Sequence, residues 1–107
     1  MIEKLSKVRD ALLEVSDNVH HYTGDSKNNT YIVWMEDGEG DSLFAENANN
    51  DMSISGTIDL FTKAEYDILC ERIPETLSKN DICWKLNSVQ YEEETKLIHY
   101  EWIFEVV

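Results

Sequence analysis

The sequence predicts an α+β fold, a two-layer sandwich in which two helices cover a mainly antiparallel sheet of about five strands. Two observations predict it. Apolar residues recur at helical spacing in two segments, and elsewhere they alternate with polar residues at the period of a strand. Read in order, these segments give α-β-β-β-α-β-β. A chain of 107 residues is the size of one domain, so residues 1–107 are expected to form a single domain.

The first helix is predicted over residues 2–19, because its apolar residues fall three and four positions apart on one stripe. They are Ile2, Leu5, Val8, Leu12, Val15 and Val19. Gly24 and the polar residues that follow it are typical of a loop, so the helix should end near residues 20–23. His20 and His21 would then lie at its C-terminal end, where an imidazolium suits the helix dipole.

Two strands are predicted next, over residues 31–36 and 42–46, joined as a hairpin by residues 37–41. This connection, the acidic turn, carries three acids and two glycines, and glycine readily supplies a positive φ. A third strand is predicted over residues 52–61, with Ile54, Ile58 and Leu60 on one face. Gly56 in its middle indicates a bulge or a close backbone approach.

The second helix is predicted to begin at Thr62, because Thr62 and Glu65 have the spacing of a capping box. Its apolar face would comprise Tyr66, Leu69, Cys70, Ile73 and Leu77. Pro74 interrupts this pattern, so it should either kink the helix or start a separate final turn.

The last two strands are predicted over residues 82–92 and 97–107, with residues 93–96 as the turn. The final strand alternates regularly, and its apolar face comprises Ile98, Tyr100, Trp102, Phe104 and Val106. The strands also hold the three tryptophans and three of the tyrosines. Most of these rings are expected in the core, and any on the outer sheet face would mark an assembly surface.

The charge excludes several kinds of partner. The chain has 22 acidic and 9 basic residues and a net charge of -13. That balance disfavours binding to nucleic-acid backbones and to anionic membranes, and it favours basic or neutral partners. No apolar run reaches the ~20 residues of a membrane span, and the N-terminus does not resemble a signal peptide. Two cysteines make no disulfide framework, so Cys70 and Cys83 are expected to be reduced thiols in the cytosol.

No catalytic motif accompanies these features, and we expect a protein that is not an enzyme, without cofactor or catalytic residue. The acidic turn offers carboxylates to calcium, but an EF-hand loop starting at Asp37 would need Gly at 42 and Glu at 48. Those positions hold Ser42 and Ala48. The histidines and cysteines are too dispersed for a zinc motif, so no metal is expected. Two interpretations of the acidic turn then remain: a solvated hairpin tip, or an electrostatic docking tip for a neighbouring subunit.

Three segments resemble small neck and tail proteins of tailed phages and prophages of Gram-positive bacteria. They are Tyr31-Ile-Val-Trp-Met-Glu-Asp-Gly-Glu-Gly-Asp, Trp84-Lys-Leu-Asn-Ser-Val-Gln-Tyr-Glu-Glu-Glu-Thr and His99-Tyr-Glu-Trp-Ile-Phe-Glu-Val. The similarity runs across nearly the whole chain. The length and element order also resemble tail terminators and related head–tail completion proteins, an arrangement that several neck proteins share.

The resemblance implies a structural subunit without a catalytic site. Such proteins form rings, commonly hexameric, that cap the tail tube and contact other neck and tail proteins. DNA passes through the ring without specific binding, and an acidic inner wall would suit that passage. The location implied is the virion tail or neck, reached from the host cytoplasm during assembly. The candidate subunit contacts are Asp37, Glu39, Asp41, Asn49 and Asn50.

One alternative belongs to a different class, an acidic inhibitor that mimics DNA and is encoded by a mobile element. The net charge of -13 permits it. A mimic should array its carboxylates in rows at phosphate-like spacing, whereas this chain gathers them at predicted turns. A mimic should also stay monomeric or dimeric and bind a basic DNA-handling enzyme.

Overall fold

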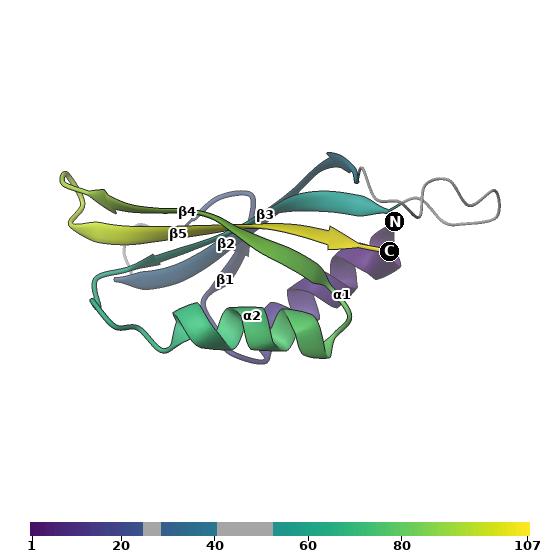
Figure 1. Cartoon of the computed structure of the whole chain (residues 1–107), viewed down its shortest axis with the longest axis horizontal. Helices are drawn as coiled ribbons and strands as arrows, with labels where there is room; N and C mark the ends of the chain where they lie inside the picture. The colour runs from purple at the N-terminus through teal and green to yellow at the C-terminus, as the bar shows by residue number, and fades with distance from the viewer. Residues whose placement is uncertain (25–28, 41–52) are drawn as a thin grey trace.

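The computed structural model describes residues 1–24, 29–40 and 53–107, and within them it confirms the α+β fold. Two helices lie on one side of a five-stranded sheet (Figure 1). The elements are α1 (Ile2–Leu13), β1 (Val19–His21), β2 (Thr30–Glu39), β3 (Ile54–Thr62), α2 (Leu69–Lys79), β4 (Cys83–Glu92) and β5 (Leu97–Val106).

The strands are arranged in the order β1-β2-β3-β5-β4, so β1 and β4 form the two edges of the sheet. The short strand β1 pairs with β2 in parallel, and every other neighbouring pair is antiparallel. The central strands β3 and β5 are paired along nine residues each, from Ile54 opposite Val106 to Thr62 opposite Ile98. This long ladder fixes which side chains share a face.

The core lies between the helices and the sheet face that they cover. Its largest fully buried side chain is Trp102, in the centre of β5, with Phe104 next to it on the same face. Val8, Ala11 and Leu12 of α1 pack against this face together with Ile73 and Leu77 of α2. As predicted, Ile54, Ile58 and Leu60 of β3 all point into the core. Burial of these apolar side chains is the main source of stability.

The first helix is shorter than predicted, and the expectation that His20 and His21 end it is wrong. α1 stops at Leu13, and both histidines belong to β1. Val8 and Leu12 are buried as the stripe predicts, but Ile2 at the start of the helix is 80% exposed. The prediction extended the helix to Val19 because this residue keeps the helical spacing. In the structure, Val19 belongs to β1 and packs against the core from there.

The predicted hairpin turn is also wrong for its described part. Asp37, Gly38 and Glu39 lie within β2, which pairs directly with β3 as far as Glu39 opposite Ile54. Asp37 is the extra residue of a β-bulge, since Glu36 lies opposite Gly56 and Gly38 opposite Ser55. Gly38 has a φ of 150°, which side-chain-bearing residues rarely adopt. The predicted strand over residues 42–46 lies outside the described residues.

Gly56 makes the close approach that its position in the strand predicted. A Cβ atom there would lie 2.0 Å from the carbonyl oxygen of Met35 and 2.6 Å from the ring of Phe104. Both distances are far below van der Waals contact. Because Gly56 has no side chain, the Phe104 ring and the backbone of β2 can pack directly against it.

The second helix begins later than the capping-box pattern predicted. Thr62 ends β3 and is fully buried, and its hydroxyl accepts a hydrogen bond from the Ala64 amide at 3.1 Å. Instead, the Asp67 carboxylate accepts a hydrogen bond at 2.9 Å from the amide of Leu69, the first residue of α2. Tyr66 precedes the helix and is 90% exposed, so its assignment to the apolar face is wrong. Pro74 lies inside α2, which continues as one element.

The last two strands and the turn between them agree with the prediction. β4 and β5 pair from Cys83 opposite Glu105 to Glu92 opposite Leu97. Trp102, Phe104 and Val106 are buried on the face that was predicted to be apolar, and Tyr100 packs against the same core.

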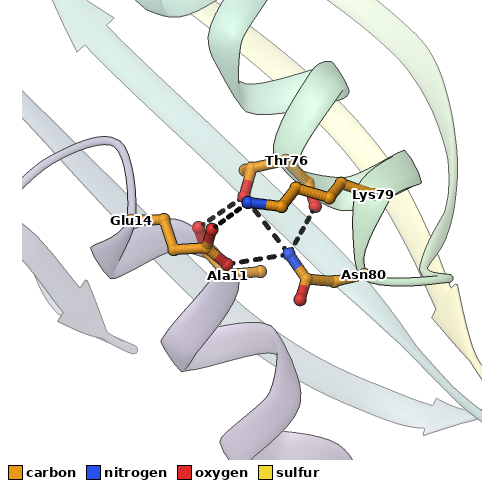
Figure 2. A network of polar contacts seen from close by, with 5 residues as sticks. All are labelled: Ala11, Glu14, Thr76, Lys79 and Asn80. Carbon is orange, nitrogen blue, oxygen red and sulfur yellow. Dashed lines mark hydrogen bonds and ion pairs between the residues drawn. The ribbon is translucent and has the colours of Figure 1, made fainter.

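A polar network joins the C-terminal ends of the two helices (Figure 2). The buried hydroxyl of Thr76 donates a hydrogen bond to the carbonyl oxygen of Ala11 at 2.9 Å. At the surface, Glu14 accepts hydrogen bonds from Lys79 and Asn80, each at 2.9 Å. These two bonds hold the pKa of Glu14 below its ordinary value.

Thr76→Val should lower the free energy of unfolding by about 1 kcal/mol, because it removes a buried hydrogen bond while keeping the side-chain shape. Lys79→Ala removes a pair exposed to solvent and should cost clearly less, because water screens the two charges. Urea unfolding of both variants measures the difference. Equal losses would mean that the surface pair contributes as much as the buried bond, which would contradict this prediction.

Candidate assembly surfaces

The edge strand β4 carries four exposed apolar side chains on one face. They are Trp84, Leu86, Val89 and Tyr91, which are 40, 45, 51 and 58% exposed, and we call them the apolar row. Their partners on β5 show that they lie on the helix-bearing face, because Trp84 is opposite Phe104 and Leu86 is opposite Trp102. The indole of Trp84 donates a hydrogen bond to Ser78 of α2 at 2.8 Å. Within the described residues, no strand pairs with the outer edge of β4.

A second bulge aligns the apolar row. Leu86 lies opposite Trp102 and Ser88 opposite Glu101, so Asn87 is the extra residue. In a regular strand, Val89 would face away from Leu86, since side chains alternate. With the extra residue, Val89 lies opposite Tyr100 and Tyr91 opposite Ile98. All four side chains of the row therefore point to the same face.

The opposite edge of the sheet holds an open apolar groove of about 300 Å³, between α1 and β1. Its lining is Ile2, Leu5, Ser6, Arg9, Leu13, Val19, His21 and Trp34. Ile2 and Leu13 are 80 and 44% exposed at its rim. His21 stacks on Trp34 with ring centroids 4.0 Å apart, and its Nε2 lies 2.7 Å from Glu36. The groove therefore has an ordered aromatic wall.

Charge differs between the surroundings of the row and the groove. The end of β4 and the turn that follows it contain Glu92, Glu93 and Glu94, with Lys96 as the last turn residue. α1, which forms one side of the groove, contains Lys4, Lys7 and Arg9 against Glu3 and Asp10, so its net charge is +1, and Arg9 pairs with Asp10. Opposite charges at the margins of two surfaces steer their encounter and fix their orientation.

The other sheet face, which the helices leave uncovered, carries a stack of rings. Tyr31, Phe61 and His99 come from β2, β3 and β5, with centroid distances of 4.8 Å between the first two and 4.2 Å between the last two. They border a hollow of about 280 Å³ that Tyr22 and Gly24 also line. The hollow thus opens where three neighbouring strands bring their aromatic side chains together.

A cluster of possible metal ligands lies beside this stack. Asp59, His99 and Glu101 each offer a ligand atom, and these atoms lie within 4.8 Å of one another. His99 Nε2 is 2.6 Å from Asp59 Oδ1. Burial raises the pKa of the Asp59 carboxyl above its ordinary value, although the hydrogen bond to His99 acts in the opposite direction. Of the histidines, His99 alone belongs to this cluster, while His20 and His21 lie on β1.

Two of the five residues predicted as subunit contacts belong to the part of the chain that the structure describes. Asp37 and Glu39 are exposed at the end of β2, and Asp37 accepts a hydrogen bond from Ser55 at 3.0 Å. Asp41, Asn49 and Asn50 lie outside the described residues. Both cysteines are free thiols, and burial raises the pKa of Cys70, which packs against the core.

The fold and these surfaces define a small α+β sandwich with an exposed apolar row at one sheet edge and an apolar groove at the other. A scan against protein-family models and a search of curated proteins both found no match. Neither described helix is long and apolar enough to cross a membrane.

Of the predicted aromatic residues, Trp34 and Trp102 are buried, whereas Trp84 and Tyr91 are exposed. They are exposed on the helix-bearing face rather than the outer face, because they share a face with their partners Phe104 and Ile98 and lie on an edge strand. Tyr31 does lie on the outer face, in the ring stack. No sequence pattern predicted the groove, because Ile2 and Leu5 belong to the stripe that was expected to be buried.

Proposed function

We propose that the protein is a structural assembly subunit whose copies join head to tail, the apolar row of one seated in the groove of the next. The observation that carries this proposal is the presence of two different apolar surfaces at opposite edges of one sheet. A contact between unlike surfaces is heterologous, and repetition of such a contact produces a closed ring or an open filament. A two-fold contact would need only one self-complementary surface.

The occupant of each surface is taken to be a second copy of this chain for two reasons. The row is a line of large, exposed apolar side chains, and the groove is a concave site of about 300 Å³ with mainly apolar walls. Glu92, Glu93 and Glu94, which follow the row, carry charge opposite to the net charge of +1 on α1. Apolar surface and charge therefore both favour this pairing.

The particular assembly we propose is the ring that caps the tail tube of a phage or prophage, as a tail terminator or another head–tail completion protein. This step rests on the sequence resemblance and on a ring-forming contact. Partners would be copies of the chain and neighbouring tail and neck proteins in the virion. With a net charge of -13, such a ring would let DNA pass without holding its phosphates.

Two variants separate the surfaces experimentally. Leu86→Thr/Tyr91→Thr removes apolar side chains from the row while keeping residues that favour strands. At the groove, Leu13→Ser/Ile2→Ser removes two exposed apolar side chains of α1. Each should weaken self-association by roughly 100-fold or more, because two side chains that lose burial cost about 1.5–3 kcal/mol each. Lys85→Thr/Gln90→Thr, on the other face of β4, is the matched control and should assemble normally.

Size-exclusion chromatography with light scattering measures the outcome, alone and with tail tubes of the encoding phage. The wild-type protein should form multiples of its 12.5 kDa mass in at least one condition. A mixture of the row variant and the groove variant retains one intact pairing, so it should stop at heterodimers. A mixture that stays monomeric would contradict the head-to-tail contact. A monomer that neither assembles nor binds tubes, but binds a basic DNA-handling enzyme, would favour the DNA-mimic alternative.

A further inference from the structure

The cluster formed by Asp59, His99 and Glu101 has the composition of a metal site. It combines one imidazole nitrogen with two carboxylates, whose ligand atoms all lie within 4.8 Å of one another. The strand register creates the cluster, because Asp59 is directly opposite Glu101 and His99 is two residues earlier on β5. The Asp59 and His99 side chains are 13 and 18% exposed, so this is not a group of freely solvated surface charges.

Neighbouring side chains hold the ligands in place. The His99 ring stacks on Phe61 at 4.2 Å with an interplanar angle of 19°. Asn87, the bulge residue of β4, donates a hydrogen bond to Glu101 Oε1 at 2.9 Å. Metal sites generally depend on such outer contacts, which orient the ligands before the ion arrives. The β4 bulge therefore also serves the outer face, by directing the amide of Asn87 toward Glu101.

The charge of the cluster also fits a cation. Two carboxylates would balance one divalent ion, and apart from His99, itself a proposed ligand, no basic side chain in the described ion pairs contacts Asp59 or Glu101. Asp59 lies directly opposite Glu101, so two carboxylates are close together on the sheet face. A bound cation would remove their repulsion.

We propose that Asp59, His99 and Glu101 bind one divalent transition-metal ion of the zinc class. An imidazole ligand favours such ions over Mg²⁺ and Ca²⁺, which prefer sites built from oxygen atoms. Three protein ligands leave a further coordination position, as zinc is usually four-coordinate. That position is open to a water molecule or to a group from another molecule, since Asp59 and His99 line the hollow of about 280 Å³. The site goes beyond the proposed assembly and lies on the opposite sheet face from the apolar row.

Isothermal titration of metal-free protein with Zn²⁺ at pH 7 tests the site, and Co²⁺ absorption reports the ligand geometry. The wild-type protein should bind one ion per chain, and bound Co²⁺ should show the visible absorption bands of a four-coordinate site. His99→Gln should weaken binding by at least 30-fold, and Asp59→Asn should weaken it similarly. The matched control, His20→Gln/His21→Gln, removes the other histidines and should leave the affinity unchanged.

Three results would overturn the proposal: no saturable Zn²⁺ binding by the wild-type protein, unchanged binding by folded His99→Gln, or loss of binding in the control. Circular dichroism checks the fold of each variant. A measurement on the wild-type protein needs no substitution: Zn²⁺ should shift the imidazole nitrogen resonances of His99, and not those of His20 or His21. Because the readout is binding, failure of the metal site would leave the assembly proposal untouched, and the reverse also holds.

Discussion

Trp102→Ala should lower the free energy of unfolding by about 3–5 kcal/mol, the largest loss expected from any single truncation in this chain. Trp102 is 2% exposed in the centre of the core. Its neighbours across the sheet are Ile58 on β3 and Leu86 on β4. Truncation would leave a cavity that the surrounding strands, fixed by their ladders, can close only in part. Since small domains are stable by about 5–15 kcal/mol, the variant should be close to unfolding.

Ile103→Ala is the matched control for this prediction. Ile103 is the next residue of β5, but it lies on the other face and is 41% exposed. Its truncation should cost less than about 1 kcal/mol, because much of its surface is already in water. Urea unfolding followed by tryptophan fluorescence and circular dichroism compares the two variants. Similar losses for both would contradict the assignment of the two sheet faces.

Gly56→Ala should lower the free energy of unfolding by about 3 kcal/mol, a large effect for the addition of one methyl group. The reason is steric, because the new Cβ would lie 2.0 Å from the Met35 carbonyl oxygen. A backbone atom of a paired strand cannot move aside without breaking the ladder between β2 and β3. The same Cβ would press on the Phe104 ring at 2.6 Å.

A double variant identifies the contact responsible. Phe104→Leu added to Gly56→Ala relieves the contact with the ring but not the contact with the backbone, so it should rescue little of the lost stability. Full rescue would assign the effect to the ring. A Gly56→Ala protein within about 0.5 kcal/mol of the wild type would show that the strands can separate more easily than their register implies.

Local sequence patterns were sufficient for the long elements. Strands β3, β4 and β5 were predicted within a few residues, because a strand with one buried face must alternate its side chains. β1 was missed because three residues are too few to show a period. Its strand character comes from pairing with Ile32, Val33 and Trp34, more than ten residues away. The start of α2 was misplaced because Thr62 is buried at the end of β3, and the amide of Leu69, at the start of α2, bonds to Asp67 instead.

Bulges account for the errors within strands. The acidic, glycine-containing segment after Met35 has the composition of a turn, yet an extra residue at Asp37 lets β2 continue to Glu39. The bulge at Asn87 places Leu86 and Val89 on one face, although their spacing of three residues in the sequence predicts opposite faces. A one-residue change in register reverses every later side chain, and no single-strand pattern reveals it.

The α+β class and the apolar faces of the long strands follow from the sequence alone, because these depend on periods within short segments. The order α-β-β-β-α-β-β agrees with the structure, although its first strand is β1, which no sequence pattern predicted. The sequence also indicated the absence of a known catalytic motif. The tertiary structure decided which residues meet. His99 reaches Asp59 across 40 residues of sequence, and the row and groove occupy opposite sheet edges. Such proximity depends on strand order, register and bulges, which result from packing of the whole chain and leave no local pattern.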